Sequence, residues 1–543
     1  MLEKINKDIL SKVVIIGIAI FGGIAIYLST HHGPGIGGDA TIYLFSAKNF
    51  LAGHGLGLIE PDGSFRLIPY FPPFYSLVLS FFGLLNFDLI TTARWINIIL
   101  FSGLILLIGL VMWKYSRSIF FTAATCALIA FSPLLIPAYS WAMSEPLAIF
   151  LGFLGLLLLF CNKNNKFTLI VFLSALFVGL SILTRYSHIA FLITAVVFII
   201  FKRKIFANTI KNLVAYGLTS TIPISIWIIY DLLNTTTISS RSLETLSGAI
   251  ERASNFWPLF KDVVLFWLIP DSWINTPKYP LELNTGLFYI SILCIILGIG
   301  IVYIKRNRKP KELYFQQLFD LAILLIVFVI SYTGIIFFVY LTTYPPITIG
   351  SRMFSTVHIA IFWLIMVLLV LIQKIWDKSI ALKICFIFGT GIFVLWYGWR
   401  SELIVKQYYK LGLGYTSVSW QESDTIAAIK DLPEDQLIVS NEQNAVLFLT
   451  DRIVYPFKEI YYDTPLDNYF VYGDGDLEND VGQIKFKEDG AALVLFDSIY
   501  FQMNELYGDN TDQRIDALIH GLDKAFRGAD GTIYYYPENK RQK

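Results

Sequence analysis

Charged residues are rare in this sequence and stand between long apolar runs, so the few that occur are the first place to look for chemistry. Asp39 follows the flexible pair Gly37-Gly38 and precedes residues 41–51, whose apolar periodicity predicts a helix. A carboxylate in this position could take a proton from a hydroxyl group of a bound substrate. Aspartate is also a favoured first residue of a helix, so a purely structural explanation stands beside the catalytic one.

A second carboxylate, Glu145, lies between Ser144 and Pro146 and directly precedes another apolar run. We predict that Glu145 shares the acid–base chemistry with Asp39. The alternative is an acid that stabilises the first turn of a helix through the helix dipole.

Three arginines could bind a phosphate group, because the planar guanidinium forms paired hydrogen bonds with phosphate oxygens. They are Arg352, Arg185 and, as third choice, Arg66. Each could equally be an interface residue that extends its charge towards the lipid headgroups. His54 and His358 are candidate ligands of a divalent metal ion, and the alternative for both is a solvated or hydrogen-bonded histidine.

The composition shows where these side chains must be held. Of 543 residues, 55% are hydrophobic and only 15% are charged, with a mean hydropathy of +0.61. Soluble domains carry about 25% charged residues, so this chain is adapted to a lipid bilayer. The sequence has no Gly-rich phosphate loop followed by Lys-Ser/Thr, no His-Glu-x-x-His and no Gly-x-Ser-x-Gly, which argues against the common soluble-enzyme classes. We predict no nucleic-acid partner.

A helix needs about 20 apolar residues to cross a bilayer. The N-terminal segment is basic (Lys4, Lys7 and Lys12) and then apolar, without a small-residue cleavage site, which favours an uncleaved anchor. About eleven spans are predicted, at residues 13–30, 94–113, 118–136, 146–161, 167–183, 188–201, 212–230, 284–304, 318–341, 354–373 and 380–397.

The apolar run 70–86 is ambiguous, and the distribution of lysine and arginine decides its status. If it does not span, the N-terminus and every lysine-rich loop lie on the cytoplasmic side. We therefore expect residues 70–86 to enter the outer leaflet only in part. This topology places the loops 31–93, 137–146, 231–283 and 342–353, the turn 184–187 and the tail on the outer face.

The tail from about residue 400 is polar, with acidic stretches such as Asp474-Gly475-Asp476. Strands are predicted at 436–440, 491–496 and 532–536, and helices at 423–430, 445–450 and 514–526. The pattern predicts a small extracytoplasmic α/β domain over 401–543, after a transmembrane domain over 1–400 that carries the outer loop 31–93.

Several short motifs occur together in a recognisable order. They are Gly38-Asp39-Ala40 followed by Tyr43, Asn49-Phe50, Gly53 and Gly55; Pro72-Pro73-x-Tyr75; Ser144-Glu145-Pro146; Leu183-Thr184-Arg185-Tyr186; and Ser351-Arg352. This order resembles the GT-C membrane glycosyltransferases, in the subgroup of the protein O-mannosyltransferases, the aminoarabinose transferase of lipid A and the rhizobial lipopolysaccharide sugar transferases. The resemblance covers roughly residues 10–400. In the tail, Gly412-x-Gly414-Tyr415, Trp420 and Ser440-Asn441 look like an extra domain of bacterial members.

The resemblance implies transfer of a sugar, with inversion, from a polyprenyl-phosphate donor to a glycan, lipid or protein acceptor on the outer face of a plasma (inner) membrane. Asp39 matches the position of the catalytic acid in the first outer loop, and Arg352 and Arg185 match arginine positions. The mannosyltransferases have Asp-Glu where this chain has Asp39-Ala40, so a second carboxylate would come from elsewhere, and Glu145 is the candidate. Some relatives use a divalent metal ion.

Two other classes stay open. A transporter or flippase for a polyprenyl-linked sugar would bind the same lipid, although such proteins usually carry ionisable residues at mid-membrane depth and repeated halves. Neither feature is visible here. A non-catalytic scaffold of envelope polysaccharide assembly is the third reading, and the presence of Asp39, Glu145 and Arg352 argues against it.

Overall fold

The structure is a computed structural model that describes residues 2–60, 63–162, 168–201, 209–234, 242–270, 281–305, 313–344, 346–376, 379–456, 486 and 489–537. The acidic stretch 474–476 and most of the basic loop clusters used to predict the sidedness lie outside these residues. The chain forms two compact units: residues 1–31 with 69–410, and residues 32–68 with 411–543.

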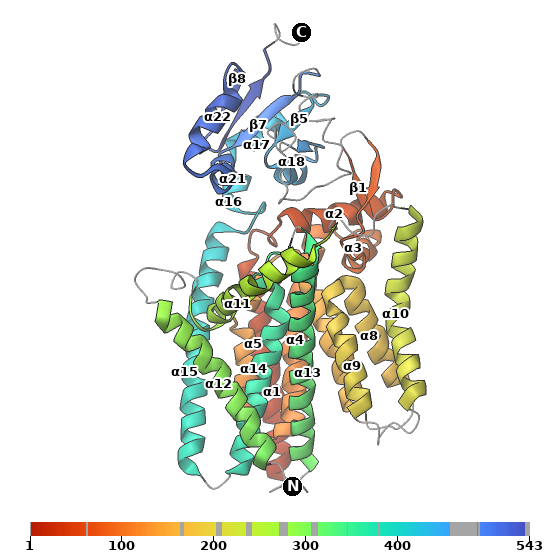
Figure 1. Cartoon of the computed structure of the whole chain (residues 1–543), viewed down its shortest axis with the longest axis vertical. Coiled ribbons are helices and arrows are strands. Elements are labelled where there is room, and N and C mark those ends of the chain that lie inside the picture. Colours follow the sequence, from red (N-terminus) through yellow and green to blue (C-terminus); the bar gives the residue numbers. More distant parts are fainter. Residues whose placement is uncertain are drawn as a thin grey trace. The chain divides into compact units, whose positions relative to one another are not determined.

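The first unit is almost entirely helical (Figure 1). Its long apolar helices are α1 (Leu2–Ser29), α4 (Leu89–Ser116), α10 (Thr209–Asn234), α12 (Leu281–Lys305), α13 (Leu313–Thr342), α14 (Ser355–Ile375) and α15 (Ile380–Leu411). Its shorter helices are α3 (Phe74–Leu84), α5 (Ile119–Ala130), α6 (Leu135–Ser140), α7 (Glu145–Cys161), α8 (Leu169–Thr184), α9 (Ile189–Phe201) and α11 (Leu246–Leu268), with the 3-10 turns η1 (Tyr186–His188) and η4 (Ser351–Phe354).

Among the described residues, seven helices are long and apolar enough to cross a membrane, and each of the eleven predicted spans falls on an apolar helix. The multi-pass character is thereby confirmed, whereas the number of crossings stays a prediction. Helix α3 covers the ambiguous run 70–86 and has 11 residues. At 1.5 Å per residue it rises about 16 Å, roughly half of the hydrocarbon core, so it cannot cross alone.

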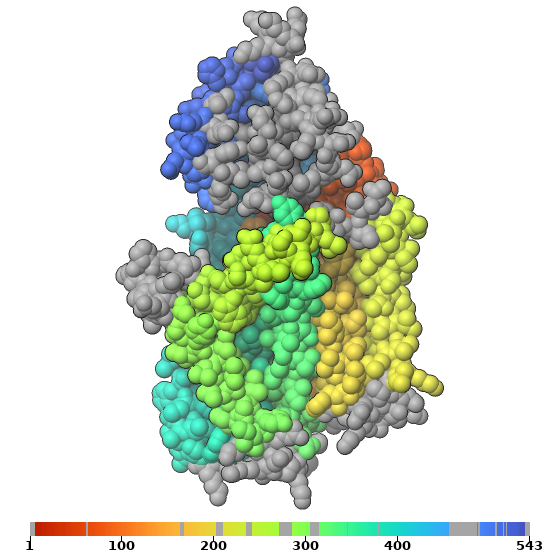
Figure 2. Space-filling view, in the orientation of Figure 1, coloured from red at the N-terminus to blue at the C-terminus, as the bar shows by residue number. Residues whose placement is uncertain are grey.

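Helix α11 follows a different course from the apolar helices around it. It runs obliquely across α12 and α13 (Figures 1 and 2). Its N-terminal end is fastened by a short antiparallel pair, β3 (Ser242–Leu243) with β4 (Thr343–Tyr344). At its C-terminal end the Arg400 guanidinium donates to the carbonyl oxygens of Phe266 and Ile269, at 2.9 and 3.0 Å. These bonds satisfy the last carbonyls of the helix, which have no partner inside it.

The second unit contains the predicted α/β domain. Its sheet has the order β6 (Tyr455–Pro456), β5 (Ile438–Ser440), β7 (Ala492–Phe496), β9 (Gly531–Tyr535) and β8 (Asp523–Arg527). Strand β5 is parallel to β6 and β7, and β9 is antiparallel to β7 and β8. The helices are α16 (Val418–Gln421), α17 (Asp424–Lys430), α18 (Gln443–Thr450), α21 (Ser498–Tyr507) and α22 (Thr511–Ile519), with the 3-10 turn η5 (Gly508–Asn510).

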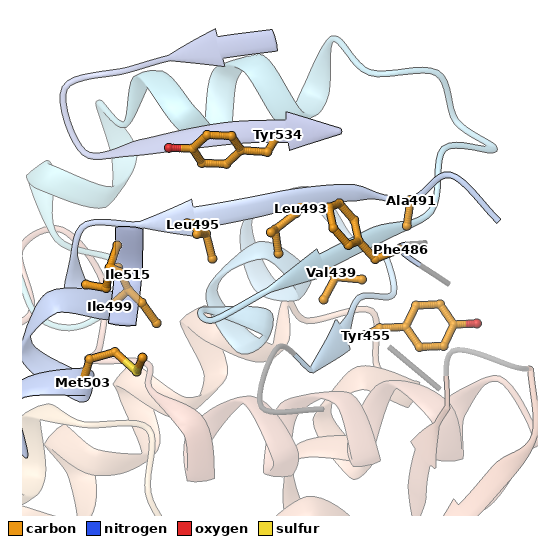
Figure 3. Close-up of a cluster of buried hydrophobic side chains, with 10 residues drawn as sticks. All are labelled: Val439, Tyr455, Phe486, Ala491, Leu493, Leu495, Ile499, Met503, Ile515 and Tyr534. Atoms are coloured by element: carbon orange, nitrogen blue, oxygen red, sulfur yellow. The ribbon is translucent and has the colours of Figure 1, made fainter. Parts of the chain in front are cut away.

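The sheet is buried on both faces, as the central strand shows. Because successive side chains of a strand point to opposite faces, Leu493 and Leu495 enter one core and Ala492, Val494 and Phe496 the other. In the first core Leu493 and Leu495 lie with Ile499 of α21 and Ile515 of α22 (Figure 3). The second core takes side chains from α17 and α18. An unbroken apolar strand is what burial between two helical layers requires.

One predicted element of this domain is wrong. The helix predicted over 514–526 ends at Ile519, and residues 523–527 form strand β8 instead. Gly521 adopts a φ of +73°, a left-handed conformation that stops a helix. Ala529 and Asp530 then form the turn between β8 and β9, and Gly528 N donates to Gly531 O at 2.9 Å.

The second unit also contains residues 32–68 from the first outer loop. They form α2 (Gly38–Leu51) and an antiparallel hairpin of β1 (Gly57–Ile59) and β2 (Phe65–Leu67). The domain boundary predicted at residue 400 lies inside the continuous helix α15. Asp39 therefore belongs to the same compact unit as the C-terminal α/β domain.

Candidate functional site

Asp39 lies in the first turn of α2 and is half-buried. Gly37 has an extended backbone and precedes the helix, and its carbonyl accepts from the N–H of Thr41 at 2.9 Å and from the Thr41 hydroxyl at 3.0 Å. The structural explanation considered for Asp39, that it caps the helix, is therefore wrong, because the helix begins one residue before it. The carboxylate is left in the first helical turn, where the helix dipole favours a negative charge.

The chain before Asp39 is seated on the C-terminal residues of its own unit. Ile36 pairs with Gly414, and the N–H of Tyr415 donates to Ile36 O at 2.8 Å. The Thr416 hydroxyl donates to Pro34 O at 2.9 Å. The sequence motif Gly412-x-Gly414-Tyr415 makes this contact possible, since Gly412 and Gly414 adopt φ values of +71° and +53° that other residues rarely tolerate.

The far end of α2 is fastened as well. The Lys48 ammonium lies 2.6 Å from a carboxylate oxygen of Asp451, at the end of α18. The Asn49 side-chain amide donates to Gly57 O at 2.8 Å and so fixes the β1–β2 hairpin against the helix. Arg66, the third phosphate-binding candidate, forms an ion pair with Glu60 next to this hairpin.

The first unit holds the other candidates. Glu145 begins α7 and its side chain is only 4% exposed. Its Oε1 atom lies 2.9 Å from Nη1 of Arg185 and 3.2 Å from Nε of Arg352. Arg185 Nη1 also donates to the hydroxyl of Ser144 at 3.3 Å. The prediction that these three distant turns lie together is confirmed.

The two arginine turns are joined by a tyrosine. The Tyr332 hydroxyl, on α13, donates to Met353 O at 3.0 Å in the Arg352 turn and lies 3.4 Å from the Ser187 hydroxyl in the Arg185 turn. His188 completes this support, with Nδ1 2.7 Å from the Ser181 hydroxyl and Nε2 3.5 Å from that of Thr356. Sequence reasoning missed Tyr332, because a tyrosine inside an apolar run gives no local signal of a bridging function.

Two guanidinium groups share one carboxylate in this cluster. Arg185 and Arg352 stay 21% and 46% exposed while Glu145 is covered. A cationic surface that presents guanidinium groups can bind an anion such as a phosphate.

Other predicted outer-face arginines have structural partners. Arg94 donates to Thr30 Oγ1 and Tyr27 O, both at 3.0 Å, and Arg252 donates to Thr343 O at 2.7 Å. Arg400 holds the end of α11, as described above. These contacts account for the three arginines without a ligand.

The histidines do not assemble a metal site within the described part of the chain. His358 is buried in α14 with Nε2 3.3 Å from the Tyr397 hydroxyl, and His54 follows α2, with its backbone N–H bonded to Asn49 O. Across the described residues no group of three His, Cys, Asp or Glu side chains could hold a metal ion. A divalent ion at Asp39 stays a prediction.

The chain was also compared with known proteins. No family model matches it, and no curated protein matches it. Among solved structures, ArnT from Cupriavidus metallidurans bound to undecaprenyl phosphate aligns with 12% identity and a TM-score of 0.50, over 96% of this chain and 97% of that one. The oligosaccharyltransferase of Archaeoglobus fulgidus tethered with an acceptor peptide aligns with 13% identity and a TM-score of 0.46, over 97% and 75%. The likeness to the ArnT structure shows that this chain shares its fold.

Proposed function

We propose that this chain, which has the fold of GT-C membrane glycosyltransferases, transfers a sugar from a polyprenyl-phosphate donor to an acceptor hydroxyl at the outer face of a plasma (inner) membrane. The observation that carries the proposal is the cluster of Arg185 and Arg352 around Glu145. The guanidinium groups of Arg185 and Arg352 suit the phosphate of a lipid donor, because they can form paired hydrogen bonds with its oxygens. The ArnT structure of the same fold was solved with undecaprenyl phosphate, which supports this class of donor.

In the proposed reaction the acceptor oxygen attacks the anomeric carbon, and the bond from that carbon to the phosphate oxygen breaks. Asp39 takes the proton of the acceptor hydroxyl. The electron pair of the broken bond stays on the lipid phosphate, and Arg185 and Arg352 stabilise the added negative charge. A single displacement of this kind inverts the anomeric configuration. No step is assigned to a metal ion.

We propose that Glu145 positions other residues and is not a second catalytic carboxylate. A carboxylate shared by two guanidinium groups is a poor proton acceptor, because both charges stabilise its ionised form. We assign it to holding Arg185 and Arg352 in register for the phosphate. Arg66 is paired with Glu60, so we place it outside the donor site.

The test uses the purified full-length protein in detergent with undecaprenyl phosphate carrying labelled glucose, galactose, mannose or aminoarabinose. We expect label to leave at least one of these lipids, passing to an added acceptor or to water. In detergent there are no compartments, so a flippase would leave every donor intact. If the donors stay intact and labelled lipid moves across the membrane of reconstituted vesicles, the protein is a flippase and not a transferase.

A further inference from the structure

The turn between β5 and α18 belongs to the C-terminal domain and is built with unusual rigidity. Asn441 accepts from the N–H of Phe496 at 2.8 Å and donates to the hydroxyl of Ser498 at 3.1 Å. Its amide also donates to Phe496 O, at 3.4 Å. The side chain of Asn441 thus ties the turn to the end of β7, just before Glu442 and Asn444.

Those residues carry hydrogen-bonding groups that the protein does not use. Glu442 Oε1 accepts from the Ser498 hydroxyl at 2.6 Å and from the Gln502 amide at 3.3 Å. Within the described residues Oε2 of Glu442 has no hydrogen-bond partner, and neither has the side-chain amide of Asn444. Both residues are half-buried. Burial raises the pKa of Glu442, and the bond from Ser498 lowers it in part.

This turn adjoins the residue before Asp39. A Cβ atom on Gly38 would lie 3.5 Å from Nδ2 of Asn444. Helices α2 and α18 therefore meet at two points, Gly38 with Asn444 at one end and Lys48 with Asp451 at the other. Asp39 is the next residue after Gly38 in α2.

Tyr415 adds an aromatic ring to the same place. Its backbone is bonded to Ile36, and its ring lies edge-on to Trp420 with centroids 5.5 Å apart. Burial and, second, the negative charge of Glu442 raise the pKa of the Tyr415 hydroxyl. Asp39, Glu442 and Asn444 thus belong to one compact unit, in which Tyr415 is bonded to the chain just before Asp39.

We propose that Glu442 and Asn444 form an acceptor subsite that binds neighbouring hydroxyl groups of a saccharide next to Asp39. A carboxylate oxygen only accepts hydrogen bonds, whereas the amide both donates and accepts, which matches sugar hydroxyls that do both. The inference rests on the proposed transferase function and deepens it, since it names the class of acceptor and the residues that select it.

The experiment uses the full-length protein, the donors named above and an acceptor panel of octyl glucoside, octyl galactoside, octyl mannoside and an octylated serine peptide. Transfer to at least one glycoside is expected. In Glu442→Gln and Asn444→Ala the KM for that glycoside should rise about 10-fold or more, as expected for loss of a hydrogen bond to a charged or buried group. The larger part of the loss should fall on KM and not on kcat, and the ratio of transfer to donor hydrolysis should drop with it.

Glu442→Asp, which keeps the carboxylate, should recover part of the affinity. The matched control is Glu422→Gln, an exposed carboxylate at the end of α16 in the same unit, which should behave like the wild type. A variant that is merely damaged loses transfer and hydrolysis together. Transfer to the serine peptide alone, hydrolysis without transfer to any glycoside, or an unchanged KM in both variants would overturn the subsite. Absence of both transfer and hydrolysis in the wild type would instead overturn the proposed function.

Discussion

The two candidate regions of this molecule hold their charged side chains by different kinds of contact. In the first unit, Arg185 and Arg352 stand on turns between apolar helices and share the covered carboxylate of Glu145. In the second unit, Asp39 stands in the first turn of a helix whose supports are mostly backbone and neutral polar contacts to residues 411–451. The first region concentrates positive charge, and the second presents a carboxylate.

The difference follows from the solvent that each region faces. Between apolar helices an isolated charge is costly, so the two arginines are kept with a counter-charge. A domain in water can hold its carboxylate with ordinary hydrogen bonds. Displacement of a phosphate from the anomeric carbon of a sugar requires cations near the leaving phosphate and a base near the attacking hydroxyl.

The largest loss of transfer activity is expected on substitution of Asp39. Replacing it with asparagine removes the base but keeps the size of the side chain, so we expect transfer to fall about 1,000-fold. Binding of the donor lipid should persist, because Arg185 and Arg352 are untouched. Turnover and donor binding are measured separately, with Asp435→Asn, an exposed carboxylate of the same unit, as the control. Full turnover in Asp39→Asn would remove the carboxylate from the mechanism.

The arginine region is tested by Arg352→Gln. Losing a charge-assisted bond to phosphate should weaken donor binding about 10- to 100-fold. Arg352→Lys should recover only part of this, since an ammonium group lacks the planar paired geometry. Arg117→Gln, an arginine at the end of α4, serves as the control. Equal donor affinity in Arg352→Gln and the wild type would show that Arg352 does not bind the donor phosphate.

Much of the first unit could be predicted from the sequence, because its signals are local. An apolar run of sufficient length has few structures available in a bilayer, and the placement of lysine and arginine then groups the remaining loops. This reasoning brought Glu145, Arg185 and Arg352 to one place. The bridging hydroxyl of Tyr332 was beyond it, because tyrosine occurs throughout the apolar helices.

The second unit was harder to predict for a physical reason. The pairing of Ile36 with Gly414 and the approach of Asn444 to Gly38 join residues about 400 positions apart, and no periodicity records such contacts. The segment 32–68 was therefore assigned to the transmembrane domain, although it packs with residues 411–543. The periodicity of residues 514–526 predicts a helix over strand β8 because it carries no sign of the left-handed backbone that Gly521 adopts, where the helix has ended.

Glu145→Gln tests how much the shared carboxylate contributes to the stability of the first unit. Without the carboxylate the two guanidinium groups lose their shared counter-charge, and we expect the free energy of unfolding to fall by about 2 kcal/mol, less than for a fully buried pair because Arg352 is half-exposed. The double variant Glu145→Gln with Arg352→Gln should lose less than the sum of the two single variants. Thermal unfolding of the full chain in detergent measures both. Additive losses would mean that the ion pairs do not hold these turns.

The smallest effect is expected at Lys48, whose ion pair with Asp451 is the one charged link between α2 and α18. The two side chains are 53% and 65% exposed, so water and salt screen their attraction. Lys48→Met should lower the free energy of unfolding by about 0.5 kcal/mol and change transfer less than about twofold, and raising the salt concentration should erase the difference. A loss of transfer as large as that of Asp39→Asn would show that Asp39 is positioned by this ion pair. The backbone contacts of residues 34–37 would then be insufficient to hold the carboxylate. Both regions, and not the first alone, would depend on ion pairs.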